Sequence, residues 1–412
     1  MLVAKYLDKI IRVGTLTVVD AHGKTHRFKG DEGPAVTVCL HDKALHWKLF
    51  FNPQLYAGEA FTDGNLTIVG GNIYDFLELL GMNMARVYPP LMQRMALWGH
   101  KMARRLHQYN PAGRARKNAA HHYDLSGQFY DLFLDANKQY SCAYFTGGNN
   151  DLNIAQTDKM HHIAAKLLLE PGHKVLDIGS GWGGLAIFLA REMGVDVTGL
   201  TLSEEQLKVA EASARKAGLE DRVRFKLRDY REETGSYDRI VSVGMFEHVG
   251  VNHFGTYFAK VRELLTDNGV MLLHTIGRVD GPGTTDPWTR KYIFPGGYIP
   301  ALSELAASIE MAALWATDIE VLRLHYANTT SHWRRRFLAR RADAEALYDE
   351  RFCRMWEYYL ACSEISFRYL GNVVFQIQLA KGQETVPLTR DYIARAWDRA
   401  AKGGLPSDRE AA

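Results

Sequence analysis

The sequence contains few cysteines, and no two of them are close together. The four among its 412 residues are Cys39, Cys142, Cys353 and Cys362, and no CxxC spacing occurs. Neither a zinc site nor a disulfide scaffold is therefore expected, because both need cysteines grouped along the chain. A reducing cytoplasm is accordingly the expected compartment.

Long apolar stretches are also lacking. No segment approaches the roughly 18–20 apolar residues that a membrane-spanning helix needs, and residues 1–10 lack the apolar centre of a signal peptide. The protein is not expected to be integral in a membrane, although it can lie on one. Hydrophobic residues make up 47% of the chain and charged residues 24%, with a net charge of +3. That composition is typical of a soluble globular protein and excludes collagen-like and disordered classes.

Acidic residues are absent from 91–122, although this segment contains seven Lys and Arg. Apolar residues recur there at three- and four-residue steps: Leu91, Met95, Trp98, Met102 and Leu106. The pattern predicts a basic amphipathic helix, either a membrane-surface element or a linker helix packed on its neighbour. Residues 110–113 break this helix. We therefore expect an N-terminal accessory domain at 1–112, with a docking role, and a catalytic domain at 113–402.

The two parts differ in their predicted secondary structure. Short strands are expected at 11–20, 25–28, 35–40 and 44–51, the first two forming a hairpin, with a helix at 73–80. Beyond residue 150, strands alternate with helices. The expected strands are 174–178, 196–200, 223–227, 237–243 and 270–276, and the expected helices are 184–193, 203–217 and 257–265. This alternation predicts an α/β fold with a doubly wound, mostly parallel sheet.

A glycine-rich turn follows the first of these strands, in VLDIGSGWGG at 175–184. Glycines let the backbone approach a ligand closely, and the following helix offers free N–H groups. Gly179 and Gly181 combine with Gly184 to fit GxGxxG and with Gly183 to fit GxGxG. The pattern alone leaves open a dinucleotide, another nucleotide-like ligand, or a turn without a ligand.

Asp177 argues against a dinucleotide. It stands two residues before the first glycine, where a carboxylate repels a pyrophosphate but suits a cation such as S-adenosylmethionine. The acidic residue expected about 20 residues further on in a dinucleotide site is missing, since 200–203 reads LTLS.

Glu247 and His274 follow or lie on two further strands of the predicted sheet. Ligands of doubly wound sheets bind at the carboxyl ends of the strands, so we expect these two side chains to converge beside the cofactor. A Glu and a His there suit acid–base work or anion positioning. The alternative is that Glu247 caps the next helix and that His274 is a hydrogen-bonded core residue.

Six blocks in this order resemble cyclopropane-fatty-acyl-phospholipid synthases. They are QYSCAYF at 139–145, VLDIGSGWGG at 175–184, TLSEEQ at 201–206, DRIVSVGMFEHVG at 238–250, LLHTIG at 272–277 and DPWTRKYIFPGG at 286–297. The resemblance covers roughly 110–385 and favours S-adenosylmethionine as cofactor. Its N-terminal matches are looser.

The resemblance implies a Rossmann-like methyltransferase that transfers a methylene from S-adenosylmethionine to a cis double bond of a phospholipid acyl chain, through a carbocation, with bicarbonate as base. Residues that match the bicarbonate-holding, catalytic positions are Cys142, Glu247, His274, Ile276 and Tyr326. Residues expected to bind the cofactor are Tyr140, Ser141, Asp177, Gly179, Gly181, Gly183, Thr201, Leu202 and Gln206, with Asp229 or Tyr230 on the adenine side.

The resemblance also implies a homodimer, and a membrane phospholipid as substrate at the inner face of the membrane. One position departs from the family: YYLACS at 358–363 places Cys362 one residue early in a late helix, so no catalytic role is assigned to it. The rival function is a related fatty-acid methyl or methylene transfer without ring closure. An ordinary small-molecule methyltransferase would not need the basic segment. Nucleic acid is not an expected partner, because basic residues are not interleaved with aromatics around the cofactor site.

Overall fold

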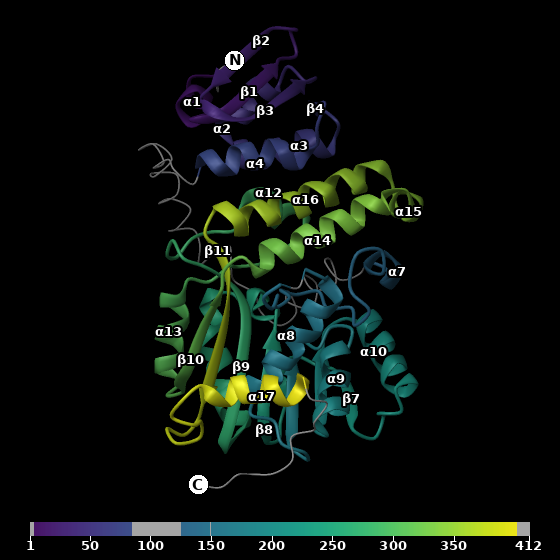
Figure 1. Cartoon of the computed structure of the whole chain (residues 1–412), viewed down its shortest axis with the longest axis vertical. Coiled ribbons are helices and arrows are strands. Elements are labelled where there is room, and N and C mark those ends of the chain that lie inside the picture. The colour runs from purple at the N-terminus through teal and green to yellow at the C-terminus, as the bar shows by residue number, and fades with distance from the viewer. Residues whose placement is uncertain (1–3, 85–124, 149, 402–412) are drawn as a thin grey trace. The chain divides into compact units, whose positions relative to one another are not determined.

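The computed structural model describes residues 4–84, 125–148 and 150–401, and its ribbon is shown in Figure 1. The chain forms two compact units. One comprises Met1–Ala103, Thr284–Pro295 and Ala327–Asn372, and the other comprises Arg104–Gly283, Gly296–Tyr326 and Val373–Ala412. Each unit is therefore assembled from separated stretches of the chain. The predicted helix at 91–106 and the predicted boundary at 110–113 lie outside the described residues.

The second unit contains a seven-stranded sheet in the order β10-β11-β9-β8-β5-β6-β7. Its strands are β5 (Lys174–Ile178), β6 (Asp196–Thr201), β7 (Val223–Leu227), β8 (Tyr237–Val243), β9 (Leu265–Arg278), β10 (Trp315–Leu322) and β11 (Asn372–Ala380). The pairs from β9 to β7 are parallel, and β10 pairs antiparallel with β11. The predicted doubly wound α/β fold is confirmed, and β5, β8 and β9 are neighbours as expected.

Helices cover both faces of this sheet. The described α-helices that lie wholly in this unit are α7 (Gly127–Tyr130), α8 (Leu152–Lys166), α9 (Gly184–Met193), α10 (Glu204–Lys216), α11 (Phe254–Leu264), α13 (Leu302–Met311) and α17 (Asp391–Ala401). Side chains of α8 and α9 pack with Val175 and Leu272 on one face. Side chains of α11 and α13 pack with Leu176 and Leu273 on the other. Successive strand residues alternate between the faces, so His274 lies on the same face as Leu272, towards α8.

The first unit contains a four-stranded sheet in the order β2-β1-β3-β4. Its elements are α1 (Ala4–Ile10), β1 (Val13–Val19), β2 (Thr25–Lys29), β3 (Asp31–Leu40), α2 (Leu45–Phe51), α3 (Pro53–Thr62), β4 (Leu66–Val69), α4 (Ile73–Met84), α12 (Pro287–Tyr292), α14 (His325–Ala339, which begins in the second unit), α15 (Arg341–Leu347) and α16 (Glu350–Tyr369). The predicted hairpin is confirmed by the antiparallel pairing of β1 with β2.

The predicted strand at 44–51 is wrong, because Leu45–Phe51 is the helix α2. The less exposed residues of α2 are spaced as on one face of a helix, because Leu45 is buried and Leu49, one turn later, is half-buried. Trp47 and Phe51 are exposed. Trp47 and Phe51, of a residue type enriched in strands, therefore point towards solvent. Asn52 then caps α3, which begins at Pro53.

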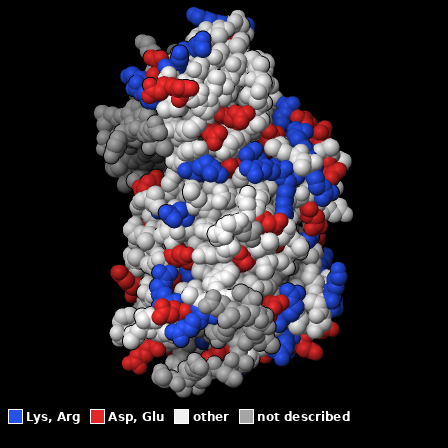
Figure 2. All heavy atoms as spheres, viewed as in Figure 1, with Lys and Arg blue, Asp and Glu red and all other residues white. Residues whose placement is uncertain are grey.

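Opposite charges are interspersed on the face of the molecule in Figure 2, and no patch of one sign dominates it. Ion pairs such as Arg341 with Glu350, at 2.7 Å, and Arg351 with Asp63, at 2.9 Å, are typical of this arrangement. Such surface pairs contribute little to stability. Within the described helices, none is both long and apolar enough to cross a bilayer.

Candidate functional site

A cavity at the carboxyl ends of β5, β6 and β8 gathers the predicted cofactor residues of the second unit. All of them except Gly183 line it: Tyr140, Ser141, Asp177, Gly179, Gly181, Thr201, Leu202, Gln206, Asp229 and Tyr230. This is the place at which a doubly wound sheet binds its ligand. Residues that sequence reasoning missed also line it, among them Trp182, Arg231 and Met245.

The glycine turn has the backbone geometry that only glycine adopts without strain. Gly179, Gly181 and Gly183 have φ values of +88°, +54° and +84°. A Cβ at Gly179 would lie 2.6 Å from Met245 Cβ, and one at Gly183 would lie 2.7 Å from the Phe225 ring. A Cβ at Gly181 would meet no atom within 4 Å. Gly179 and Gly183 are therefore required for packing, while Gly181 borders open space in the cavity.

Asp177 brings a buried carboxylate to the cavity. Burial raises the pKa of Asp177 to about 7, and the nearby ammonium of Lys159 opposes that shift. The Oδ2 atom of Asp177 has no hydrogen-bond partner among the described residues. A buried carboxylate oxygen without a partner is costly, so this atom fits a cationic or hydrogen-bonding ligand.

Lys159 of α8 is fully buried and was not predicted from the sequence. Its ammonium donates to Gln139 Oε1 at 2.7 Å and to Ser141 Oγ at 2.8 Å, which fixes the loop that lines the cavity. Burial lowers the pKa of Lys159 to about 8. Ala155 and Ile163, four residues before and after Lys159, are also buried on α8, but no local pattern in the sequence marks Lys159 as a residue of the site.

The polar residues after β6 and β7 hold each other in place around the cavity. The Thr201 hydroxyl donates to Gln206 Oε1 at 2.9 Å, and Ser203 caps α10 by accepting from the Gln206 N–H. After β7, Asp229 forms two hydrogen bonds with the Arg231 guanidinium, at 2.8 and 2.7 Å. Both Asp229 and Tyr230 line the cavity.

Glu247 and Ile276 are in direct contact. Glu247 lies in the 3₁₀ turn after β8, and its Oε1 accepts the Ile276 backbone N–H at 2.6 Å. The Oε2 atom has no hydrogen-bond partner among the described residues. Burial raises the pKa of Glu247 to about 7. Glu247 is therefore bonded to β9 rather than capping a helix, with one carboxylate oxygen left for a ligand.

His274 is two residues before Ile276 on β9 and is almost wholly buried. Its Nδ1 contacts the Gln376 side-chain nitrogen at 3.2 Å, and its Nε2 has no hydrogen-bond partner in the described part of the chain. Burial lowers the pKa of His274 well below its usual value, and the charges of Lys159 and Lys166 act in the same direction. The imidazole is therefore neutral at neutral pH.

Cys142 and Tyr326 are both buried and belong to two segments in contact. The backbone N–H of Phe145 donates to His325 Nδ1 at 2.9 Å, which ties the loop after Cys142 to the start of α14. Neither residue lines the cavity described above, and neither do Glu247, His274 and Ile276. The five predicted anion-holding residues thus lie outside the lining of the predicted cofactor site.

Comparisons with known proteins agree with this geometry. The family model described as mycolic acid cyclopropane synthetase matches residues 111–377. A probable fatty acid methyltransferase of Pseudomonas putida is 36% identical over 384 residues, which cover 90% of this chain and 94% of that protein. The cyclopropane-fatty-acyl-phospholipid synthase of Escherichia coli (strain K12) is 43% identical over 263 residues, which cover 64% of this chain and 67% of the synthase.

A solved structure is similar as well. The crystal structure of the mycolic acid cyclopropane synthase CmaA1 complexed with SAH and CTAB has 31% sequence identity and a TM-score of 0.61, and the match covers 66% of this chain and 98% of that one. The range 111–377 includes every predicted site residue. The family resemblance predicted from the sequence is confirmed: the chain belongs to the mycolic acid cyclopropane synthetase family, of S-adenosylmethionine-dependent methyltransferases of the cyclopropane synthase type.

Proposed function

We propose that this protein is a cyclopropane-fatty-acyl-phospholipid synthase, which adds a methylene to a cis double bond of a phospholipid acyl chain. The observation that carries the proposal is two buried atoms that have no hydrogen-bond partner among the described residues, Glu247 Oε2 just after β8 and His274 Nε2 on the neighbouring strand β9. An ordinary methyltransferase cavity does not require such a pair. The 43% identity to the Escherichia coli synthase supports the same substrate class.

The residues of the cavity fit S-adenosylmethionine, which supplies a methyl group on a positively charged sulfur when bound. Asp177 offers the cationic end of such a ligand a buried carboxylate oxygen, which has no hydrogen-bond partner in the part of the chain that the structure describes. Gly181 leaves space where a side chain would intrude. The first backbone N–H groups of α9, as in any α-helix, have no partner within the helix, and no side chain caps this helix at Gly183. We propose that Thr201, Gln206 and the residues at 229–230 hold the nucleoside.

The pair formed by Glu247 and His274 fits bicarbonate, which supplies a base that takes up the proton released on ring closure. The ion carries both a hydroxyl donor and carboxylate acceptors. We propose that the hydroxyl donates to Glu247 Oε2 and that His274 Nε2–H donates to a carboxylate oxygen. The thiol of Cys142, the Tyr326 hydroxyl and the backbone at Ile276 complete the proposed anion site. Because these residues are buried, water is excluded from the proposed site. Water would otherwise react with the carbocation on the acyl chain.

The product assay distinguishes this function from its rival. The full chain is incubated with S-adenosylmethionine, bicarbonate and vesicles of monounsaturated phosphatidylglycerol, and the released acyl chains are analysed by mass spectrometry. We expect a gain of one CH₂ with no alkene remaining. A product that keeps its alkene would support methyl or methylene transfer without ring closure, and no lipid product would refute both.

The helix α2 is our proposed contact with the membrane. Trp47 and Phe51 are 59% and 74% exposed, and Phe50 packs edge-on against Phe51. Exposed Lys43 precedes this cluster, and exposed Lys48, which pairs with Asp42 at 3.1 Å, lies within it. Aromatic rings beside lysines match a lipid surface, because the rings enter the apolar boundary while the ammonium groups meet anionic head groups. The bilayer position of the proposed substrate requires such a contact.

Replacing Trp47, Phe50 and Phe51 together by serine is expected to weaken binding to these vesicles on the order of 100-fold, since a fully buried ring contributes about 1.5–3 kcal/mol. Sedimentation of the protein with sucrose-loaded vesicles measures the loss. Trp315→Ser is the matched control, because Trp315 is also half exposed, at 49%, but lies in the other unit. Equal binding of the triple variant and the control would contradict the proposed contact.

A further inference from the structure

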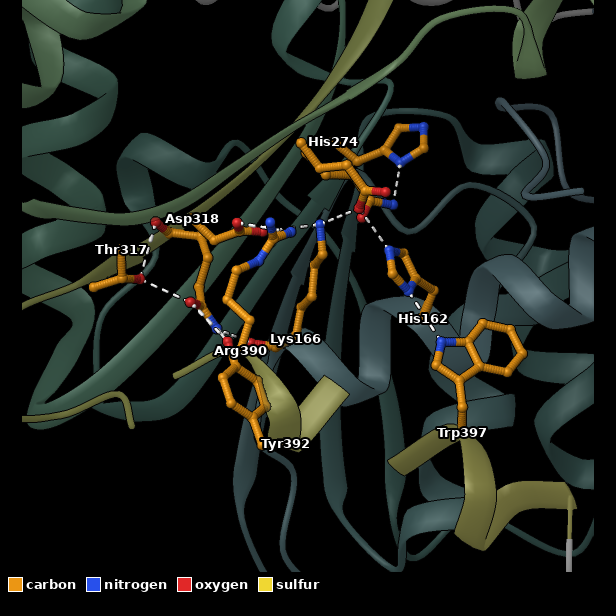
Figure 3. Close-up of polar contacts among 11 residues, drawn as sticks. His162, Lys166, His274, Thr317, Asp318, Arg390, Tyr392 and Trp397 are labelled. Carbon is orange, nitrogen blue, oxygen red and sulfur yellow. Dashed lines mark hydrogen bonds and ion pairs between the residues drawn. The ribbon is translucent and has the colours of Figure 1, made fainter. Parts of the chain in front are cut away.

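A layer of buried polar side chains lies between α8 and the sheet of the second unit, where apolar residues would be expected. Lys166 of α8 is fully buried and pairs with Asp318 at 3.1 Å and with Glu320 at 2.5 Å. Glu320 also accepts from His162 Nε2 at 2.7 Å. Figure 3 shows these contacts lying next to His274. Buried ion pairs are poor stabilisers because of their desolvation cost, so their place beside the proposed anion site calls for another role.

Gln376 belongs to the same layer and touches His274 directly. It is fully buried on β11, and its cross-strand neighbour on β10 is Glu320. The side-chain nitrogen of Gln376 faces His274 Nδ1 at 3.2 Å. With the side-chain amide in this orientation its nitrogen can only donate, which assigns the acceptor role to Nδ1 of the neutral imidazole and the ring proton to Nε2. The Nε2 atom is the one without a partner among the described residues.

His162 shows the same arrangement. The indole N–H of Trp397, on α17, donates to His162 Nδ1 at 3.3 Å, and burial lowers the pKa of His162. The ring proton is therefore on Nε2, from which it is donated to Glu320. In both histidines an N–H group from outside the ring occupies Nδ1 and directs the proton to the opposite nitrogen. Hydrogen bonds of this kind orient the ring and select its tautomer.

We propose that Gln376 is a positioning residue, which holds His274 in the tautomer whose Nε2–H donates to an anion. The inference deepens the proposed function and rests on it, because the anion at Nε2 is the proposed bicarbonate. Lys166 and His162, through Glu320, hold the strand face on which Gln376 lies. The side-chain amide itself does not touch the anion. It acts by keeping a donor where a carboxylate oxygen must be bound.

The test replaces Gln376 by methionine, which keeps the length of the side chain and removes the donor. In the wild type we expect ¹⁵N NMR to show the His274 proton on Nε2, with the signals assigned by their loss in His274→Asn. In Gln376→Met the tautomers should mix, and the kcat should fall on the order of 10- to 100-fold, as on loss of an outer partner of a functional histidine. Binding of S-adenosylhomocysteine should not change.

Gln378→Met is the matched control. Gln378 is equally buried two residues further along β11, and its amide donates to the Lys166 carbonyl and the Tyr392 hydroxyl instead. We expect this variant to keep the His274 tautomer and the kcat. If Gln376→Met does not fold, Gln376→Glu is used in its place. The new carboxylate can only accept a hydrogen bond, so it should move the His274 ring proton to Nδ1.

A wild-type proton on Nδ1, or a Gln376→Met variant with unchanged tautomer and kcat, would overturn the inference. The proposed function fails separately, if the wild type modifies no unsaturated phospholipid. The NMR result tests the tautomer in either case.

Discussion

Glutamine in place of Glu247 is expected to lower turnover by about 100- to 10,000-fold, the usual range for loss of an acid–base group, while S-adenosylhomocysteine binds almost unchanged. Glu247 does not line the cofactor cavity, so the loss should be confined to the chemical step. An amide keeps the size of the side chain and still accepts from Ile276 N–H, but it presents a donor where Oε2 accepts. Turnover is measured by product formation and cofactor binding by titration calorimetry.

Glu233→Gln is the control for this variant. Glu233 is buried like Glu247, but it is paired with Lys226 and Arg228 beside β7, at the edge of the sheet. Loss of those pairs should lower stability and leave the kcat of the folded protein unchanged. Wild-type turnover in Glu247→Gln would remove Glu247 from the mechanism, whereas an equal loss in both variants would mean that the effect is structural.

Replacing Gly181 by valine is expected to weaken the binding of S-adenosylhomocysteine by at least about 100-fold without unfolding the protein. An added Cβ meets no atom within 4 Å, and Gly181 lines the cavity, so the new side chain occupies the space proposed for the ligand. Its positive φ of +54° adds strain of roughly 1–2 kcal/mol. Calorimetric titration measures the binding, and thermal unfolding measures the strain.

Gly218→Val separates these two effects. Gly218 also has a positive φ, +65°, and open space around its Cβ, but it follows α10 and does not line the cavity. Both variants should lose similar stability, and only Gly181→Val should lose the ligand. Retained affinity in Gly181→Val would place the cofactor elsewhere.

Local signals were sufficient to predict five of the seven strands in the sheet of the second unit, whereas β10 and β11 were not predicted. The strands that deliver Asp177, Glu247 and His274 are apolar runs punctuated by glycine, and such runs predict buried parallel strands. The order of β5, β8 and β9 followed from the general winding of these folds. The N-terminal unit was predicted less well, because the aromatic residues of α2 have the composition of a strand while Leu45 alone supplies its buried contact.

The positioning groups could not be predicted from local patterns. Lys159, Lys166 and Gln376 are polar residues inside apolar periodic segments, where composition gives no reason to expect partners. Their partners come from distant stretches: Gln376 meets His274 across 102 residues, and Lys166 meets Glu320 across 154. Only the packing of α8 on β10 and β11 shows that these residues share one buried layer.

The last part of this layer to be synthesised is α17 with the residue just before it. Arg390 pairs with Asp318 at 3.0 Å, and Trp397 donates to His162. A ribosome makes α8, β9 and β10 well before these residues, so on the nascent chain Asp318 and His162 lack these two partners until translation passes position 397. This polar layer can therefore take its final form only after the residues up to Trp397 have been synthesised and have left the ribosome.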